Sequence, residues 1–263
     1  MIELIDSQRA FFVFLIAVII SSGCIETGSA NLNSDFGLDY KDVNLDSSGL
    51  EVFEDSMSRV DQVSEYSSES DNSMVINLPG FSVSVNMTSN GVFDQNSSTV
   101  NTSGVMELDF VGNSNSTEFS TQVKSGENGT EVYREAMGKE NHTEKQYSRE
   151  ELGVTLEALR SIGVENASVL GVSNISGEEN ILLDLDVNSS ELLRNSEHIF
   201  EAHSIVMEST DSGEGLKSSD AFNQTEAYLW ADRDDRTPSK FAYYGSVENG
   251  SVQVRSVTEY SKR

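Results

Sequence analysis

The sequence is poor in the residues that stabilise or bind through special chemistry. Its 263 residues include one cysteine, two prolines, one tryptophan and three histidines. A single cysteine cannot form an internal disulfide, so packing alone must stabilise the fold. The spacing of His142, His198 and His203 does not place the imidazoles together, and no cysteine pair accompanies them, which argues against a transition-metal site.

Cations are also scarce, since 17 Lys and Arg face 44 Asp and Glu and leave a net charge of −27. Phosphate binding needs clustered Lys and Arg, so this composition argues against nucleic acid as a partner. The carboxylates are spread along the whole chain, as on halophilic surfaces that stay hydrated in salt. A disordered acidic chain is the alternative, but regular apolar patterning after residue 48 favours a folded domain.

One long apolar run is present, at residues 10–20, and no second one follows. Eleven residues reach about 16 Å as a helix, roughly half of a bilayer core of about 30 Å. This length is typical of an export signal. Residues 21–24, Ser-Ser-Gly-Cys, resemble the lipobox of prokaryotic lipoproteins, in which the cysteine is lipidated.

The resemblance implies a signal peptide at 1–23 and a lipid on Cys24 that anchors the chain to the outer face of the cytoplasmic membrane. An uncleaved signal anchor with an unmodified Cys24 is the alternative. Residues 24–48 are rich in Gly, Ser, Asn and Asp and predict a disordered tether, followed by one domain at 49–263.

The domain is predicted to begin with a helix. Ser48 and Glu51 have the spacing of a capping box, in which each side chain satisfies a backbone donor at the helix start. Leu50, Phe53, Met57 and Val60 then follow at spacings of three and four, which predicts one buried helical face.

Alternating apolar residues predict antiparallel strands through the middle of the chain. Three Asn-Gly pairs, at 90–91, 128–129 and 249–250, predict tight hairpins between such strands. Further strands are predicted at 169–172 and 181–187, across a turn at 176–177, and at 226–230, 240–247 and 251–260.

Two further helices are predicted, at 148–159 and 190–200. Capping boxes at Ser148 with Glu151 and at Asn188 with Glu191 mark their starts. The fold class is therefore α+β, mainly β, with an antiparallel meander rather than βαβ units.

Three stretches resemble the LolA/LppX-type lipoprotein carriers and their archaeal outer-surface relatives. They are the strand, Gly turn and strand at 169–177 and 181–186; Leu229-Trp230-Ala-Asp232 followed by Pro238-Ser-Lys240; and the predicted helix at 147–159. The likeness spans about residues 49–260. It implies a half-barrel sheet whose concave side carries about three short helices and holds acyl chains or another apolar ligand.

Under this resemblance, the candidate cavity residues are the apolar side chains of the predicted strands and the single tryptophan. They are Phe81, Val83, Val85, Met87, Met106, Leu108, Phe110 and Trp230. A lone tryptophan on an aliphatic strand is also typical of a packed core, so this assignment has a structural alternative.

Eleven Asn-x-Ser/Thr sequons exceed the four or five that this composition would give by chance and indicate a glycosylated outer surface. The candidate acceptors are Asn96, Asn101, Asn115, Asn128, Asn141 and Asn249. Composition alone is the alternative explanation of the excess.

No catalytic motif is present: the sequence has no nucleophile elbow, phosphate loop or His-Glu-x-x-His. Asp184-Leu-Asp186-Val-Asn188 begins like a calcium loop but lacks its glycine and closing glutamate. We therefore expect no enzyme, cofactor or metal, but a lipid-anchored protein that carries an apolar, lipid-like ligand. The alternative is a glycosylated structural or adhesive surface protein whose core is filled by its own side chains.

Overall fold

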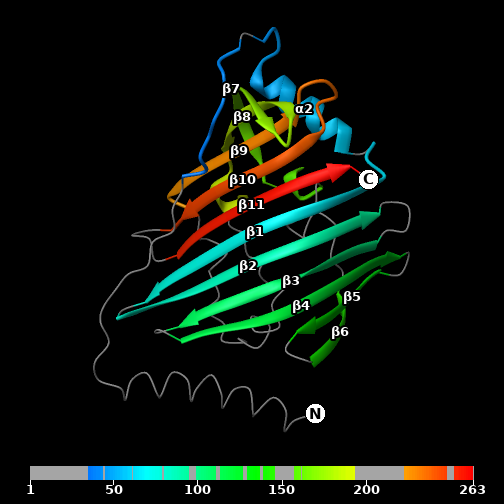
Figure 1. The fold of residues 1–263 in the computed structure, drawn as a ribbon, viewed down its shortest axis with the longest axis vertical. Helices are drawn as coiled ribbons and strands as arrows, with labels where there is room; N and C mark the ends of the chain where they lie inside the picture. The colour runs from blue at the N-terminus through cyan, green and yellow to red at the C-terminus, as the bar shows by residue number, and fades with distance from the viewer. Residues whose placement is uncertain are drawn as a thin grey trace.

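The part of the chain that the structure describes forms one antiparallel sheet, with the helix α2 near one end (Figure 1). A computed structural model describes residues 35–43, 45–60, 62–78, 80–94, 99–110, 113–126, 129–136, 139–145, 157–160, 162–192, 222–247 and 252–262. Residues 1–23 and Cys24, the predicted signal and lipidation site, lie outside this part. Within it, no helix has the length and apolar character needed to span a bilayer.

The helical elements are α2 (Gly49–Val60) and the short 3₁₀ helix η2 (Glu157–Arg160). The strands of the first half are β1 (Glu65–Leu78), β2 (Phe81–Asp94), β3 (Thr99–Phe110), β4 (Asn113–Gly126), β5 (Gly129–Ala136) and β6 (Lys139–Lys145). Those of the second half are β7 (Val164–Ile175), β8 (Glu178–Val187), β9 (Gln224–Asp232), β10 (Pro238–Ser246) and β11 (Val252–Lys262).

Two meanders share the sheet, and the first and last strands join them. The strand order is β6-β5-β4-β3-β2-β1-β11-β10-β9-β8-β7, and every neighbouring pair is antiparallel. β1 pairs with β11 from Tyr66 opposite Lys262 to Ile76 opposite Val252. The prediction of a mainly β, antiparallel meander is therefore confirmed, with β6 and β7 at the edges of the described sheet.

Helix α2 packs on one face of the sheet, which we call the inner face. It contacts β7, β9 and β10, and its Val52 and Val60 belong to the same core as Leu183, Leu229 and Phe241. The core extends from there along the inner face to Phe119 and Val123 of β4. One continuous apolar core therefore connects α2 with most of the strands.

The capping box at the start of α2 is confirmed. The Ser48 backbone N–H donates to Glu51 Oε2 at 2.8 Å, and the Glu51 N–H donates to Ser48 Oγ at 3.2 Å. The predicted buried face is wrong in one position, because Leu50 is 37% exposed. The fully buried positions are Gly49, Val52, Ser56 and Val60, with Phe53 and Met57 at their edge.

The small residues on that face explain the difference. A Cβ built on Gly49 would lie 2.3 Å from the carbonyl oxygen of Ala167, so the helix start presses directly on the backbone of β7. Ser56 needs no partner from the sheet, because its hydroxyl donates to the Val52 carbonyl within the helix. Close backbone packing, rather than the largest side chains, decides which face is buried.

Asn90-Gly91 does not form the predicted turn, because both residues lie inside β2. Gly91 pairs with Ser68 of β1 and faces the inner side. A Cβ at Gly91 would lie 2.6 Å from the ring of Phe93, so this glycine leaves room for an aromatic ring folded over it. The other two predicted hairpins are confirmed by the β4–β5 and β10–β11 pairings, although Asn128, Asn249 and Gly250 lie outside the described residues.

The predicted turn at 176–177 is also confirmed, since it joins β7 to β8 with positive φ angles of 54° at Ser176 and 95° at Gly177. The predicted helix at 148–159 is described only at η2. Of the predicted helix at 190–200, residues 189–192 are helical, and Asn188 Oδ1 accepts from the backbone of Ser190 and Glu191. The remaining residues of both helices lie outside the described part, so the prediction of three concave-side helices stays a prediction.

Residues 35–43, within the predicted tether, lie against the sheet. Lys41 and Val172 form a two-hydrogen-bond bridge at 2.8 and 2.9 Å, which adds backbone pairing to the edge strand β7. Phe36 and Leu38 pack on the face opposite to α2, which we call the outer face. This part of the tether is therefore ordered, and the folded domain begins before residue 49.

Candidate functional site: the inner face of β1–β3

Apolar side chains line the inner face near the β1–β2 turn. The strand register places Ile76 beside Val83, and Met74 beside Val85, which in turn pairs with Leu108. Ile76 and Val85 pack at the margin of the core, whereas Phe81, Val83 and Leu108 extend the same apolar surface beyond it and are only partly buried. We call these partly exposed side chains the apolar rows: Ile76, Phe81, Val83, Val85 and Leu108.

A set of small polar side chains crosses the same face next to the apolar rows. We call it the polar belt: Ser68, Ser70 and Asn72 of β1, Ser89 of β2, Thr102 of β3, Thr121 of β4, and Ser256 and Thr258 of β11. Each is at most 6% exposed. Ser70 and Thr258 share a hydrogen bond of 3.0 Å across β1 and β11. Buried hydroxyls of this kind need such partners, because an unpaired one loses its hydration without compensation.

Asn72 lies where the polar belt meets the apolar surface. It is fully buried, and it sits between Ser256 of β11 and Met87 of β2 in the strand register. Its Oδ1 accepts a hydrogen bond of 2.6 Å from the Ser256 hydroxyl. Its Nδ2, which carries two donors, has no hydrogen-bond partner. Among the described residues of the inner face, Asn72 is therefore a buried amide with unused donors.

Most of the predicted cavity residues share the inner face, but Trp230 does not. Val83, Val85, Met87, Met106 and Leu108 occupy matched register positions there, and Phe81 follows the same alternation at the start of β2. The backbone of Phe110 pairs with Val83, but its side chain lies outside the described residues. Trp230 belongs to the outer face, so its assignment to the cavity is wrong.

The reason is strand alternation. Leu229 of β9 faces the inner core, so its neighbour Trp230 points the other way. There it packs with Leu182 and Ala242 under Phe36 and Leu38, and the Lys240 ammonium lies 5.3 Å from the centre of its ring. A strand buried on both faces gives no apolar–polar alternation from which the side of a tryptophan could be predicted.

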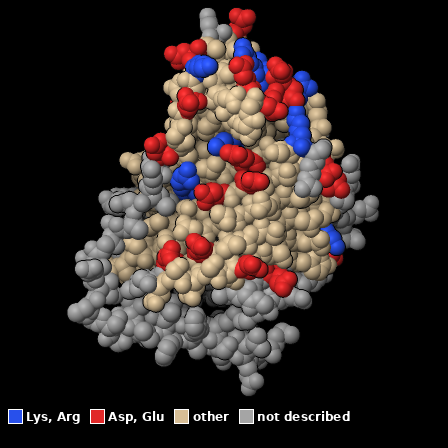
Figure 2. All heavy atoms as spheres, viewed as in Figure 1, with Lys and Arg blue, Asp and Glu red and all other residues tan. Residues whose placement is uncertain are grey.

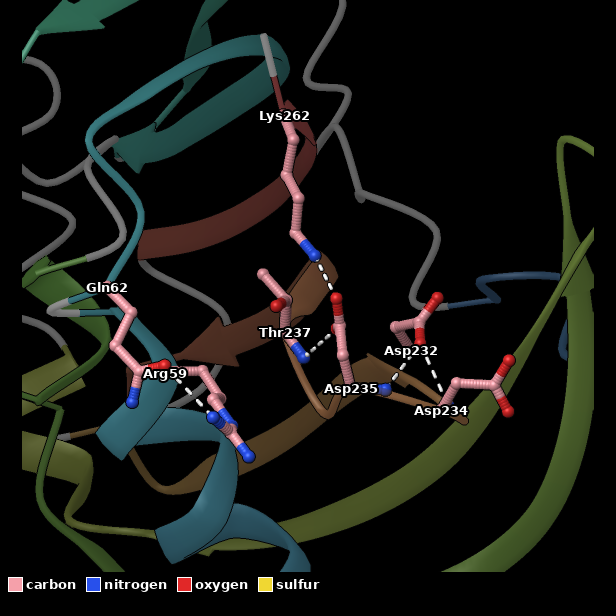
Figure 3. Close-up of polar contacts among 7 residues, drawn as sticks. All are labelled: Arg59, Gln62, Asp232, Asp234, Asp235, Thr237 and Lys262. Carbon is pink, nitrogen blue, oxygen red and sulfur yellow. Dashed lines mark hydrogen bonds and ion pairs between the residues drawn. The ribbon is translucent and has the colours of Figure 1, made fainter.

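A polar pocket of about 290 Å³ lies where α2, the β9–β10 turn and the end of β11 meet (Figure 3). Its lining includes Arg59 in the last turn of α2, Gln62 just after the helix, Asp235 and Thr237 in the turn, and Lys262 of β11. Arg59 donates to Gln62 at 2.9 Å, and Lys262 forms an ion pair with Asp235. The Lys262–Asp235 pair therefore joins β11 to the β9–β10 turn, while Arg59 and Gln62 pair with each other at the end of α2.

The turn itself is built from aspartates (Figure 3). Asp232 Oδ1 accepts from the backbone of Asp234 at 2.8 Å and of Asp235 at 2.9 Å. Burial would raise the pKa of Asp235, but hydrogen bonds from Lys262 and Thr237 and the charge of Lys262 lower it to about 2. The Asp235 carboxylate is therefore ionised across the physiological pH range and acts as a structural anion.

Carboxylates are dispersed in small groups over the visible surface and do not form one patch (Figure 2). Within the described residues, no group of three or more His, Cys, Asp and Glu is placed to hold a metal ion. Asp184 and Asp186, from the calcium-like segment, are exposed on the same side of β8. Partial desolvation of the Asp184 carboxyl, and then the charge of Asp186, raise the pKa of Asp184. The charged surface of the described residues therefore suggests no binding site, and the apolar inner face is the stronger candidate.

Two of the six candidate glycan acceptors have described side chains. Asn101 on β3 and Asn115 on β4 are both exposed, and Asn101 Oδ1 accepts a hydrogen bond of 2.8 Å from Gln122. The backbone of Asn141 is described in β6. Asn96, Asn128 and Asn249, together with the side chain of Asn141, lie outside the described residues.

No protein-family model and no curated protein matches the chain. Among solved structures, it is similar to LprF from Mycobacterium bovis, with a TM-score of 0.43 and 13% identity over 82% of this chain and 94% of that one. It is also similar to the Mycobacterium tuberculosis lipoprotein LppX, with a TM-score of 0.40 and 13% identity over 81% of this chain and 92% of that one.

Proposed function

We propose that this chain is lipid-anchored at the outer face of the cytoplasmic membrane and binds an apolar, lipid-like ligand against the inner face of its sheet. Binding uses burial of apolar surface and no covalent chemistry. The lipid on Cys24 anchors the chain to the membrane. The inner face of the sheet binds the apolar ligand. Two exposed sequon asparagines are proposed glycan acceptors: Asn101 on the outer face and Asn115, which pairs with Leu108, on the inner face.

The observation that carries the proposal is the position of the apolar rows. Val83, Phe81 and Leu108 lie on the face that elsewhere forms the core, yet they are only partly buried. Apolar surface of this kind gains roughly 25 cal/mol for each Å² removed from water, so an acyl chain laid on it is stabilised. The outer side of the same strand stretch carries Ser82, Ser84 and Asn86 and gives no such gain.

Binding of a neutral apolar dye to the purified protein tests the proposal. N-phenyl-1-naphthylamine is suitable because an anionic dye would be repelled by a chain of net charge −27. The dye should fluoresce in the protein and be displaced by a long-chain fatty alcohol. Val83→Lys places a charge in the apolar rows and should weaken binding at least about tenfold.

Ser84→Lys is the matched control, because it adds the same charge to the next residue of β2 on the opposite face. It should bind the dye like the unaltered protein, provided that circular dichroism shows both variants folded. Absence of dye binding to the unaltered protein, or equal loss in both variants, would favour the alternative of a structural surface protein with a self-filled core.

A further inference from the structure

We propose that the Asn72 amide anchors the ligand by donating a hydrogen bond to its carbonyl oxygen, which makes the preferred ligand an acyl ester or amide rather than a plain hydrocarbon. This inference rests on the proposed function and specifies the ligand class and the residue that selects it. Asn72 touches the ligand in this role and determines specificity.

The unused donors of Asn72 are the first support. Its side chain is fully buried, and Nδ2 has no partner although Oδ1 is held by Ser256 at 2.6 Å. A buried donor without an acceptor is unfavourable, because it has lost its hydration. A ligand that brings an acceptor oxygen to Nδ2 removes this penalty, whereas a hydrocarbon leaves it in place.

The position of Asn72 on β1 is the second support. Met74 and Ile76 follow it on the same face, and their cross-strand neighbours are Val85 and Val83. From Asn72 to Ile76 the strand advances about 13 Å, at about 3.3 Å per residue. An acyl chain lying along this apolar surface therefore ends with its polar group at the amide.

The cross-strand neighbours of Asn72 offer no strong acceptor for its Nδ2 donors. Its cross-strand neighbours are Met87, whose thioether is a weak acceptor, and Ser256, whose hydroxyl donates to Oδ1. Because the Asn72 side chain is fully buried, the ligand carbonyl has to enter the core to reach it. The hydrogen bond is then formed away from water, where it discriminates most strongly.

A matched pair of ligands tests the inference. Methyl decanoate and n-tridecane have the same number of heavy atoms, and only the ester has a carbonyl oxygen. Their affinities are measured by displacement of N-phenyl-1-naphthylamine from the unaltered protein and from Asn72→Leu, which keeps the side-chain size. The ratio of ester to alkane affinity should fall about tenfold in Asn72→Leu.

Ser256→Ala is the matched control, since it removes the hydroxyl on the other side of the amide and leaves the Nδ2 donors in place. It should keep the ester preference. A spectroscopic measurement on the unaltered protein needs no variant: the infrared carbonyl stretch of bound ¹³C-labelled ester should lie at lower frequency than that of the same ester in hydrocarbon solvent, as a hydrogen-bonded carbonyl does.

The outcomes separate the two proposals. If both ligands bind, but the affinity ratio is the same in Asn72→Leu and the bound carbonyl stretch is that of a carbonyl in hydrocarbon, the anchor is refuted and the proposed function stands. If neither ligand displaces the dye, both proposals are overturned. If Ser256→Ala and Asn72→Leu both lose the preference for the ester over the alkane, the preference depends on packing. This result would also refute the proposed hydrogen bond from Asn72 to the ligand.

Discussion

Two regions of the sheet are stabilised in different ways. In β8–β10, both faces are buried: Leu183 and Leu229 face the α2 core, while Leu182 and Trp230 face the outer cluster under residues 35–43. In β1–β3, the inner face carries the polar belt, and outward residues such as Glu69 are exposed. The sheet therefore has apolar side chains buried on both faces in β8–β10, whereas in β1–β3 the buried inner face carries both polar and apolar side chains.

This contrast separates stability from binding. A fully buried leucine contributes roughly 1.5–3 kcal/mol, whereas a buried neutral hydrogen bond contributes about 1 kcal/mol net. The β8–β10 region with α2 is therefore expected to hold most of the folding free energy. The β1–β3 region, with less apolar burial, can present an apolar surface and an unpaired amide without unfolding the molecule.

The largest test of this comparison is Leu183→Ala. Leu183 is fully buried in the core that it shares with α2, so the truncation should lower the free energy of unfolding by about 3 kcal/mol. Val83→Ala in the apolar rows is the matched truncation at a partly buried site and should cost less than about 1 kcal/mol. Urea denaturation measures the free energy of unfolding of both variants. Equal losses would contradict the expectation that β8–β10 contributes more to stability than β1–β3.

Phe36→Ala tests whether residues 35–43 belong to the region that is buried on both faces. The Phe36 ring meets Tyr228 edge-on at 5.7 Å and lies under the Arg255 guanidinium at 5.1 Å. Its removal should lower the free energy of unfolding by about 1–2 kcal/mol and expose the outer cluster.

Trp230 reports this exposure, because it is the single tryptophan of the chain. Its emission should shift to longer wavelength in Phe36→Ala. Addition of methyl decanoate to the unaltered protein should leave this emission unchanged, since the ligand binds on the other face. A ligand-induced shift with an unchanged Phe36→Ala spectrum would place Trp230 in the binding site after all.

Thr258→Val probes the polar belt itself. The change removes the hydroxyl that pairs with Ser70 at 3.0 Å and should cost about 1 kcal/mol. The double variant with Ser70→Ala removes both polar groups and should recover part of that loss, because no unpaired hydroxyl remains. Additive losses in the double-variant cycle would show that the belt is not held by this pair.

Asp235→Asn should have the smallest effect, because Asp235 and Lys262 are about half exposed and solvent screens their ion pair. The folded pKa of Asp235, about 2, lies below the unfolded value of 3.8. The wild-type advantage is therefore fully present above pH 3.8 and is lost as the pH falls through about 2.

Urea titrations of both proteins at neutral pH and near pH 2 measure this difference. The gap between the two unfolding free energies should close toward the acid end. If the difference in unfolding free energy does not change with pH, the charge of Asp235 does not stabilise the contact between the turn and β11.

Several elements could be predicted from local sequence. The capping box at Ser48, the turn at 176–177 and the alternation through Val83 and Leu108 each depend on neighbours within a few residues, and the structure has all of them. Strand β1 had no such signal. Tyr66 to Ser73 is almost wholly polar, so periodicity does not mark it as a strand.

The sequence by itself determined the antiparallel meander, the helix start and the apolar alternation of β2 and β3, because these follow from short-range capping, turn chemistry and side-chain alternation. Only the tertiary structure decided that β1 pairs with β11, that Trp230 faces outward and that Asn72 is buried with unused donors. Each of these depends on strands far apart in the chain meeting in one register, and local sequence carries no record of which side chain a distant strand places opposite.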